Sequence, residues 1–372
     1  MQDASHLPAL VCGLAFALAV VFGAVANRVN FCTMGAVADI VNFGDGRRMR
    51  MWLLAIAVAI LGAGALQAAG QVDLTKSIYA GSRISWLSLV VGGFLFGFGM
   101  TLGSGCGSKT LIRIGGGNLK SLVVLVFLAI AAYMTLRGVF ALWRANGLDP
   151  VRVDLKDFGA AASDLPTIAM ALGAGVAAKL WIPVAVALAL AGAVLADSDF
   201  RASREMVIGG VVIGAVIVGG WYVSGHLGYL AEDPATLEER FIATNSGRAE
   251  SFSFVGPVAY LLELLLFWTD QSRTLTFGIA GVLGVVVGSA ATAFATRTFR
   301  WEGFGSVEDV ANHVTGGILM GFGGVTALGC TIGQGLTGVS TLAVGSFLAL
   351  AAIIAGAVAA NKYQGWRVAR AG

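Results

Sequence analysis

Two cysteines of this sequence lie in glycine-rich turns of similar composition. Cys106 is in LGSGCGSKT (102–110) and Cys330 is in ALGCTIGQG (327–335). Glycine permits left-handed dihedrals and close approach, so such turns can aim several backbone N–H groups at one spot. N–H groups that open a short helix carry partial positive charge and attract an anion. The two turns therefore predict anion sites with a thiol beside each.

A thiol suits one kind of anion better than others. An S–H donor is weak and less tightly hydrated than a hydroxyl, so a throat lined by cysteine favours thiosulfate, with its soft terminal sulfur, over sulfate. Weak contacts also suit a pore, because an ion must leave it as readily as it enters. Three thiols at successive depths predict a cysteine relay. The predicted substrate-binding and relay residues are Cys32, Cys106, Cys330, Gly105, Gly107, Gly329 and Gly333.

The same residue types also have a plainer explanation. A free cysteine is most often a small buried apolar residue, and Cys12, inside an ordinary apolar run, is interpreted in this way. Gly93 with Gly97, and Gly317 with Gly321, form GxxxG patterns that predict helix packing. The four cysteines show no CxxC spacing and no clustered histidine, so we expect no metal, cofactor or redox pair.

Composition places most of the chain in lipid. Of 372 residues, 57% are hydrophobic and 12% are charged, far from the usage of soluble proteins. A hydrocarbon core of roughly 30 Å needs about 20 apolar residues per helix. About nine crossings are expected, with the last window crossing twice, at 9–26, 51–72, 84–108, 118–143, 180–196, 206–225, 274–296 and 314–361.

The chain contains an internal repeat. GGFLFGFGMTLGSGC at 92–106 returns as GGILMGFGGVTALGC at 316–330 without a gap, and eight of fifteen positions are identical. A weaker pairing sets 31–39 against 252–260, with Cys32 opposite Ser253. We therefore expect one membrane domain, 1–372, made of a first repeat at 9–143, a linker with an extra transmembrane helix at 144–203, and a second repeat at 204–361.

Four segments are expected to be short re-entrant half-helices. Residues 31–43 and 252–268 are too short to cross and have charged or polar flanks, while 104–117 and 329–339 are glycine-rich interruptions of apolar runs. Irregular backbone survives at membrane depth only where protein buries it or where it lines a cavity. The expected fold is an all-α integral membrane protein with two inverted repeats, in which half-helix termini contact the substrate.

The basic residues indicate an orientation and not a partner. They are scattered over short loops, which argues against binding to nucleic acid. The positive-inside rule predicts a cytoplasmic C-terminus, an outside N-terminus and an outside acidic loop at Glu232–Glu239. The basic residues expected on the cytoplasmic side are Arg28, Arg47, Arg48, Arg50, Lys109, Arg113, Lys120, Arg201, Arg204, Arg297, Arg300, Lys362, Arg367 and Arg370.

Few titratable groups fall at membrane depth. Asp39 and Glu263 are the intramembrane carboxylates, and such groups suggest function, although both could instead face an aqueous vestibule or an interface. His226 and His313 fall at span ends, where an interfacial role is expected. Lys109 and Arg113 could draw anions to the cytoplasmic mouth, but the positive-inside rule already accounts for them.

Together these segments resemble the YeeE/YedE family of sulfur-transport membrane proteins. The likeness rests on NRVNFCTMGA (27–36), FGFGMTLGSGCGSKT (96–110), FVGP (254–257) and GFGGVTALGCTIGQG (321–335). It implies an hourglass of inverted halves in a bacterial inner membrane, and thiosulfate uptake that depends on Cys32, Cys106 and Cys330. Some members are linked to selenium or other sulfur compounds, so a different sulfur or selenium species is an alternative substrate.

Two further expectations concern partners and activity. A dianion entering a cell held negative inside moves against the field, so we expect a cytoplasmic sulfur carrier or sulfurtransferase to consume the sulfur as it arrives. The rival function is enzymatic, with Cys106 or Cys330 forming a persulfide by nucleophilic attack. That reaction needs an activating base, and only Lys109, three residues from Cys106, is near in sequence. We therefore favour a transporter over an enzyme.

Overall fold

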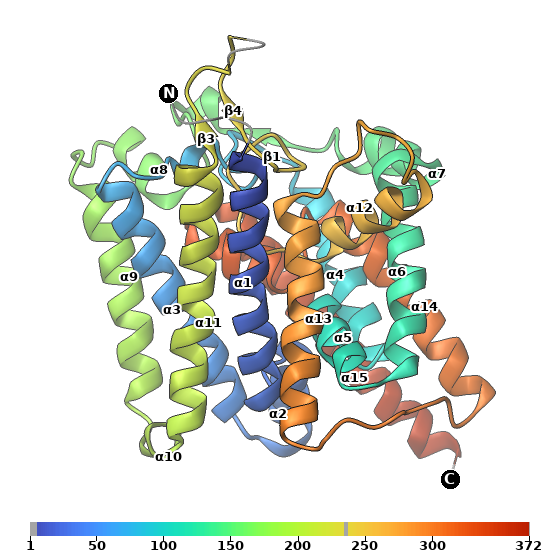
Figure 1. Cartoon of the computed structure of the whole chain (residues 1–372). Helices are drawn as coiled ribbons and strands as arrows, with labels where there is room; N and C mark the ends of the chain where they lie inside the picture. The colour runs from blue at the N-terminus through green and yellow to red at the C-terminus, as the bar shows by residue number, and fades with distance from the viewer. Residues whose placement is uncertain (1–5, 234–236, 372) are drawn as a thin grey trace.

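The computed structural model describes residues 6–233 and 237–371, which form one body of helices running between two faces (Figure 1). The first long helix starts at the upper face of Figure 1, and the last one ends at the lower face. Shorter helices and turns fill the space between the long ones. The N- and C-terminal ends of the described chain therefore lie on opposite faces, as the sequence predicts.

The helices, in chain order, are α1 (Leu7–Arg28), α2 (Thr33–Phe43), α3 (Arg47–Ala68), α4 (Trp86–Leu102), α5 (Gly107–Gly115), α6 (Leu119–Arg137), α7 (Val139–Trp143), α8 (Leu165–Ala171), α9 (Ala178–Leu195), α10 (Ser198–Ala202), α11 (Arg204–Tyr222), α12 (Val255–Leu266), α13 (Phe277–Ala295), α14 (Val307–Thr326) and α15 (Val344–Ala371). The loops carry two small antiparallel ladders, β1 (Arg83–Ile84) with β2 (Val153–Asp154) and β3 (Tyr229–Leu230) with β4 (Arg240–Phe241).

The all-α membrane fold is confirmed. Within the described residues, eight helical stretches are long and apolar enough to cross a bilayer. Three of these join a long helix to the short helical element after it, α1 to α2, α4 to α5 and α11 to η4 (Val223–Leu227). α14 also has 20 residues, but Glu308 and Asp309 occupy its first turn. It packs along α4 and α6. With α14 included, the number of long helices matches the expected number of about nine.

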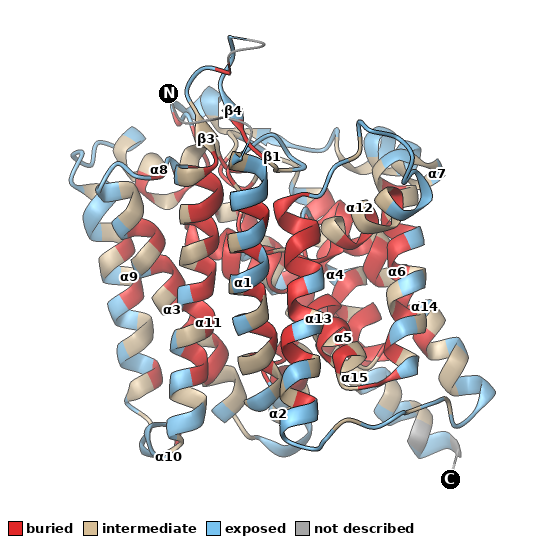
Figure 2. Cartoon of the chain, in the orientation of Figure 1, coloured by how far each residue is buried: buried red, intermediate tan, exposed pale blue. Residues whose placement is uncertain are grey.

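The burial pattern fits a bundle surrounded by lipid. Buried residues fill the centre, and exposed ones follow the outer sides of α1, α9 and α13 (Figure 2). Large apolar side chains are exposed there, including Leu10 at 49% on α1, Leu188 at 61% on α9 and Phe294 at 62% on α13. Water would penalise so many exposed apolar side chains, whereas lipid tails solvate them.

Glycines set the close packing of the long helices. Gly93 and Gly97 of α4 face backbone of α15, and Gly317 and Gly321 of α14 face backbone of α6. A Cβ at Gly93 would lie 2.8 Å from the Ala349 carbonyl oxygen, and one at Gly317 the same distance from that of Val124. Helices in lipid associate by this kind of close contact. The packing role predicted for these four glycines is confirmed.

α4 and α14 also pack against each other through glycines. A Cβ at Gly92 would lie 2.7 Å from the Gly323 carbonyl oxygen, and one at Gly316 would lie 2.7 Å from that of Gly99. In the ungapped repeat alignment Gly92 corresponds to Gly316, and Gly99 corresponds to Gly323. The two contacts are therefore the same contact with the two helices exchanged.

The predicted short segments are short helices or turns. α2 and α5 occupy the expected ranges in the first half. In the second half α12 has 12 residues, and a π-helical turn, Gly333–Gly338, follows Cys330. α2 and α12 each have residues of their first turn buried. These elements start inside the protein.

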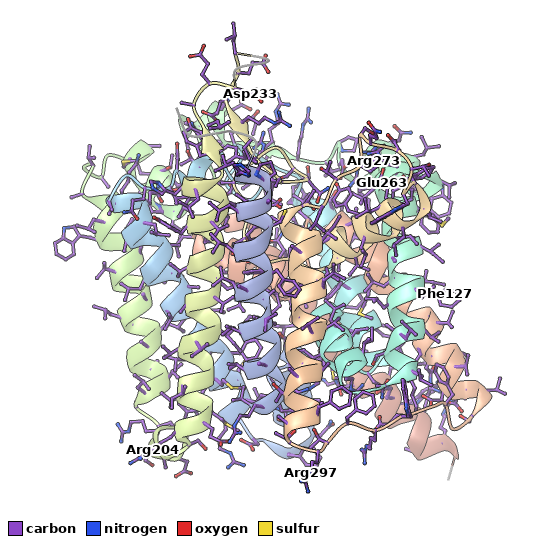
Figure 3. All side chains as sticks on the ribbon, in the orientation of Figure 1. Phe127, Arg204, Asp233, Glu263, Arg273 and Arg297 are labelled. Atoms are coloured by element: carbon purple, nitrogen blue, oxygen red, sulfur yellow. The ribbon has the colours of Figure 1, made fainter. Side chains whose placement is uncertain are left out.

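Charged residues separate onto the two faces. Arg204 and Arg297 lie at the lower face of Figure 3, the same face at which the chain ends, whereas Asp233, Glu263 and Arg273 lie at the upper face. The acidic loop expected on the side opposite the C-terminus is thus on that side, as far as its residues are described. Residues 234–236 of that loop lie outside the described residues.

Replacement of Gly97 by valine should destabilise the fold. Its side chain would overlap the Ile353 carbonyl of α15, and a backbone carbonyl can move less than a flexible side chain. We expect a loss greater than the roughly 1–3 kcal/mol of ordinary overpacking, measured as a lower melting temperature of the purified protein in detergent. Gly192→Val is the matched control, because nothing lies within 4 Å of a Cβ at Gly192 on α9. Equal melting temperatures for the two variants would contradict this view of the interface.

Candidate functional site

Cys32 and Cys106 begin two of the short helices. Cys32 is the N-cap of α2, and its Sγ accepts a hydrogen bond from the Gly35 N–H at 3.3 Å. Cys106 is the N-cap of α5, and its Sγ lies 3.4 Å from the Ser108 hydroxyl. Both residues are buried, and their side chains face each other closely enough to interact. The structure thus brings close together two free thiols that are 74 residues apart in sequence.

Cys330 lies beside this pair. It is fully buried, and its Sγ accepts a hydrogen bond from the Gly333 N–H at 3.4 Å. The N–H of Phe254, the residue before α12, also faces this sulfur. The hydroxyl of the next residue, Thr331, lies near the Cys106 thiol but makes no hydrogen bond to it. The three predicted cysteines therefore lie around one buried place, where short elements of both halves meet.

Two hydroxyls follow the cysteines and are left without partners. Thr33 comes directly after Cys32, and Thr331 directly after Cys330; both are buried. Within the described part of the chain, neither hydroxyl oxygen makes a conventional hydrogen bond to protein. A buried hydroxyl without a partner costs about 1–3 kcal/mol. These hydroxyls are therefore available to a bound anion or to water.

The predicted site glycines differ in what they do. The left-handed backbone of the two turns belongs to Ser104 (φ 57°) and Leu328 (φ 58°), whereas among the four glycines only Gly329 has a positive φ, of 159°. The expectation that glycine supplies the left-handed dihedrals is therefore wrong at Gly105, Gly107 and Gly333. Ser104 and Leu328 are equivalent in the ungapped alignment, so both turns bend in the same way.

Close approach of the backbone is required at only one of those three positions. A Cβ at Gly333 would collide with the Ser253 side chain, but at Gly107 it would meet nothing nearer than Val255, at 3.7 Å. At Gly105 the nearest atom would be a methylene of Lys109, at 3.2 Å, which can move. Gly333 is therefore the position at which a side chain has no room.

Ser253 and Tyr79 are site neighbours that the sequence did not predict. The Tyr79 hydroxyl contacts the Ser253 side chain, and both lie next to Gly333 in the Cys330 turn. The repeat alignment already set Ser253 opposite Cys32, which was a usable signal. No motif marks Tyr79, since it lies in a loop between η1 (Leu74–Lys76) and β1.

A cavity of about 200 Å³ opens beside the Cys330 turn. We call it the tyrosine cavity, and its polar lining includes Tyr79, Tyr260, Arg144, Glu250 and Ser253. Glu250 lies outside the spanning helices, is half-buried and accepts a hydrogen bond from the Ser246 hydroxyl at 3.0 Å. Burial raises the pKa of the Glu250 carboxyl to about 7, because the protein solvates its charge poorly.

A second cavity, of about 680 Å³, lies on the other side of the cysteines. We call it the basic cavity, and its polar lining includes Asn30, Lys109, Arg113, Arg297 and Arg300. Lys109 is close to both Cys32 and Cys106. Arg297 lies at the lower face of Figure 3. The cysteines therefore lie between two cavities of different charge.

The two intramembrane carboxylates are not part of the cysteine cluster. Asp39 forms an ion pair with Arg48 at 3.3 Å. Glu263 is buried at the upper face, where it pairs with Arg273 at 3.1 Å and accepts a hydrogen bond from Tyr133 at 3.2 Å. Their ion pairs explain how both carboxylates are accommodated, so neither is assigned to the site.

The remaining candidates also have local partners. The Cys12 thiol donates to the Leu275 carbonyl at 3.4 Å, and Cys12 is buried among α1 residues, as expected of a structural cysteine. His226 and His313 bond to backbone carbonyls near helix ends. The described residues hold no group of three or more His, Cys, Asp or Glu side chains able to bind a metal ion.

With this geometry in view, comparison with known proteins identifies the family. A family described as sulphur transport matches residues 28–359. The chain belongs to this family. The matched region runs from the end of α1 into α15, and so it includes all three cysteines of the cluster.

Two curated relatives are named thiosulfate transporter TsuA. The one from Escherichia coli K12 is 27% identical over 333 residues, which cover 89% of this chain and 86% of the relative. The one from Spirochaeta thermophila is 27% identical over 331 residues, 88% of this chain and 91% of the relative. The family match and the eight apolar helical stretches among the described residues show that the chain is a membrane protein of the sulphur-transport family.

Glu250 should make stability depend on pH. Its folded pKa, about 7, lies above the ordinary value of 4.5, so the fold favours the neutral acid. The resulting cost develops as pH rises from about 4.5 to 7 and stays constant above that. We expect Glu250→Gln to stabilise the protein by up to about 3 kcal/mol at pH 8 and much less at pH 5. Thermal unfolding at both pH values measures this.

Glu232→Gln is the control for this measurement. Glu232 is exposed in the acidic loop, so its replacement should leave the melting temperature unchanged at either pH. A gain for Glu250→Gln that is equal at pH 5 and pH 8 would mean that removal of the charge is not the cause.

Proposed function

We propose that this protein takes thiosulfate across the bacterial inner membrane through the cysteine cluster. The observation that carries the proposal is the meeting of three buried thiols and two partnerless hydroxyls between two cavities. The names of the two relatives support the choice of thiosulfate. The path runs from the tyrosine cavity, past Cys330, Cys106 and Cys32, to the basic cavity.

The cluster suits a dianion with one soft end. Oxygens of the anion accept hydrogen bonds from the Thr33 and Thr331 hydroxyls and from N–H groups at the starts of α2 and α5, which carry partial positive charge. The terminal sulfur meets the thiols, which are weak donors. No single contact is strong, so the anion can move from Cys330 to Cys106 and on to Cys32 without being trapped.

We propose further that the halves 9–143 and 204–361 are inverted repeats around this path, with 144–203 as an added linker and helix. The exchanged glycine contacts between α4 and α14 support this, because a twofold relation produces each contact twice. The equal turns at Ser104 and Leu328 support it as well. In this arrangement Cys106 and Cys330 are equivalent, and Cys32 corresponds to Ser253.

The orientation follows from the charges. The face that carries Arg204 and Arg297 is proposed to be cytoplasmic, because positive residues are retained on that side. The tyrosine cavity then receives thiosulfate from outside, and the basic cavity releases it inside. The N-terminus is placed outside, and the C-terminus is placed in the cytoplasm.

The membrane potential opposes uptake. Moving two negative charges inward costs about 4.6 kcal/mol at 100 mV, which corresponds to more than a thousandfold against accumulation. We propose that a cytoplasmic sulfur carrier or sulfurtransferase removes this limit. Its thiolate would take the sulfane sulfur of thiosulfate, forming a persulfide and releasing sulfite, so that free thiosulfate stays low inside.

Loss of any relay thiol should abolish most uptake. We expect initial rates of labelled thiosulfate uptake into proteoliposomes to fall at least about tenfold in Cys32→Ala, Cys106→Ala and Cys330→Ala, because each loses a contact of the path. Cys12→Ala should transport at close to the wild-type rate, since its thiol bonds to the Leu275 carbonyl, in the loop before α13 and outside the cluster. Wild-type rates in all four variants would return the thiols to a packing role.

The consumption of sulfur inside should set how far uptake proceeds. Proteoliposomes loaded with a sulfurtransferase and an acceptor thiol should accumulate total label well beyond the external concentration under an inside-negative potential, because the free dianion stays scarce. Vesicles loaded with a heat-inactivated sulfurtransferase are the control. Full accumulation in these control vesicles, with a proton gradient required, would refute the role of a consuming partner.

The enzymatic alternative has one observation in its favour, the closeness of Lys109 to Cys106, since a cation stabilises a thiolate. If Cys106 acts as a sulfurtransferase nucleophile, mass spectrometry of the purified protein after incubation with thiosulfate should detect a persulfide on Cys106. Transport by non-covalent contacts leaves all three cysteines unmodified.

A further inference from the structure

The basic cavity has more positive charge than its ion pairs neutralise. Its lining includes the cations Lys109, Arg113, Arg297 and Arg300 and the carboxylate Glu302, which gives four minus one, or a net charge of +3. Glu302 pairs with Arg300 at 2.7 Å. Among the described residues, Lys109, Arg113 and Arg297 have no ion pair. The cavity therefore attracts anions.

Lys109 connects this cavity to the thiols. It lies in the first turn of α5, three residues after Cys106, and is half-buried. Its ammonium group donates a hydrogen bond to the Asn30 side chain, two residues before Cys32. It also lies near enough to interact with both Cys32 and Cys106. An anion that leaves these thiols for the basic cavity therefore meets Lys109 first.

The other end of the path has no equivalent cation beside its cysteine. Continued past Cys106 at the same offset, the repeat alignment sets Lys109 opposite Gly333, and Arg113 opposite Thr337. The tyrosine cavity contains Arg144, which is paired with Asp149 at 3.4 Å, together with the carboxyl of Glu250. The cationic site thus lies at one face, and the second half of the chain has no equivalent of it.

We propose that Lys109 and the basic cavity form a second binding site for the thiosulfate dianion, distinct from the cysteine cluster. The Lys109 ammonium takes the anion's oxygens as its sulfur leaves Cys32 and Cys106, and Arg297 adds long-range attraction. This inference rests on the proposed transport function. It adds to that function a holding site, on the face we assign to the cytoplasm, which binds thiosulfate before a sulfur carrier or sulfurtransferase takes its sulfur.

A sided transport measurement tests the proposal. Right-side-out and inverted membrane vesicles containing the full chain allow labelled thiosulfate to be applied separately to each face. Lys109→Met should raise the half-saturating concentration at the cytoplasmic face about tenfold, the loss expected for one charge-assisted hydrogen bond. The maximal rate from that face should not fall, since the variant loses binding and not the path. At the outer face the half-saturating concentration should change less than about threefold.

Three variants complete the design. Lys109→Arg keeps the charge and should restore the half-saturating concentration to within about threefold of wild type. Arg297→Gln, at an exposed position, should cause a smaller rise on the same face, about two- to fivefold. It serves as the test if Lys109→Met does not fold. Arg204→Gln removes a charge from the same face (Figure 3) but lies outside the cavity lining, so it should behave as wild type.

The possible failures are distinguishable. If wild-type vesicles carry thiosulfate, and neither Lys109→Met nor Arg297→Gln changes the cytoplasmic half-saturating concentration, the holding site is refuted while the transport function stands. A fall in maximal rate from both faces with unchanged half-saturation would assign Lys109 a structural role and also refute the site. If wild-type vesicles carry no thiosulfate from either face, the transport function itself fails.

Discussion

The structure depends on one constraint: backbone N–H groups that begin a helix halfway through a membrane cannot face lipid. Each such group left without a partner in hydrocarbon costs several kcal/mol. α2 and α5 nevertheless start at the buried Cys32 and Cys106, and α12 starts after the buried Phe254. They are possible because the surrounding helices bury their first turns, and this burial also leaves a place at the helix starts that an anion can occupy.

The enclosure is made by close helix contacts. Glycines at the α4–α14, α4–α15 and α6–α14 interfaces let backbones approach without intervening side chains. Because the long helices pack this closely, the irregular backbone is confined to the short segments between them. The glycine contacts therefore support both the long-helix interfaces and the cysteine cluster that these helices surround. A side chain added at such an interface, as in Gly97→Val, disturbs both.

The cysteine cluster is polar but uncharged, whereas charged side chains line the cavities at its two ends. Thiols, hydroxyls and amides surround the meeting point, and the carboxylates Asp39 and Glu263 are held away by arginines. A cation among the thiols would bind a dianion more tightly than their weak contacts do and would slow its passage, and a carboxylate would repel it. Beyond the centre the two ends differ, since one exposes Lys109 and the other exposes Tyr79 and Glu250. This asymmetry gives an otherwise repeated architecture a direction.

The sequence alone determined which segments lie in lipid and which cysteines form the candidate site. Hydropathy located the long helices, the repeat of 92–106 at 316–330 located the glycine turns, and the cysteines singled out in those turns are the ones that meet. Only the tertiary structure decided which side chains share the site. Tyr79 and Thr331 belong to it because segments more than two hundred residues apart pack together, and local patterns carry no information about such contacts. Lys109 is near Cys106 in the sequence, but only the fold brings it close to Cys32. The turn dihedrals show the same limit: left-handed backbone fell on Ser104 and Leu328 and not on the neighbouring glycines, because packing selects the path of the chain and a residue's own preference contributes only about 1–2 kcal/mol.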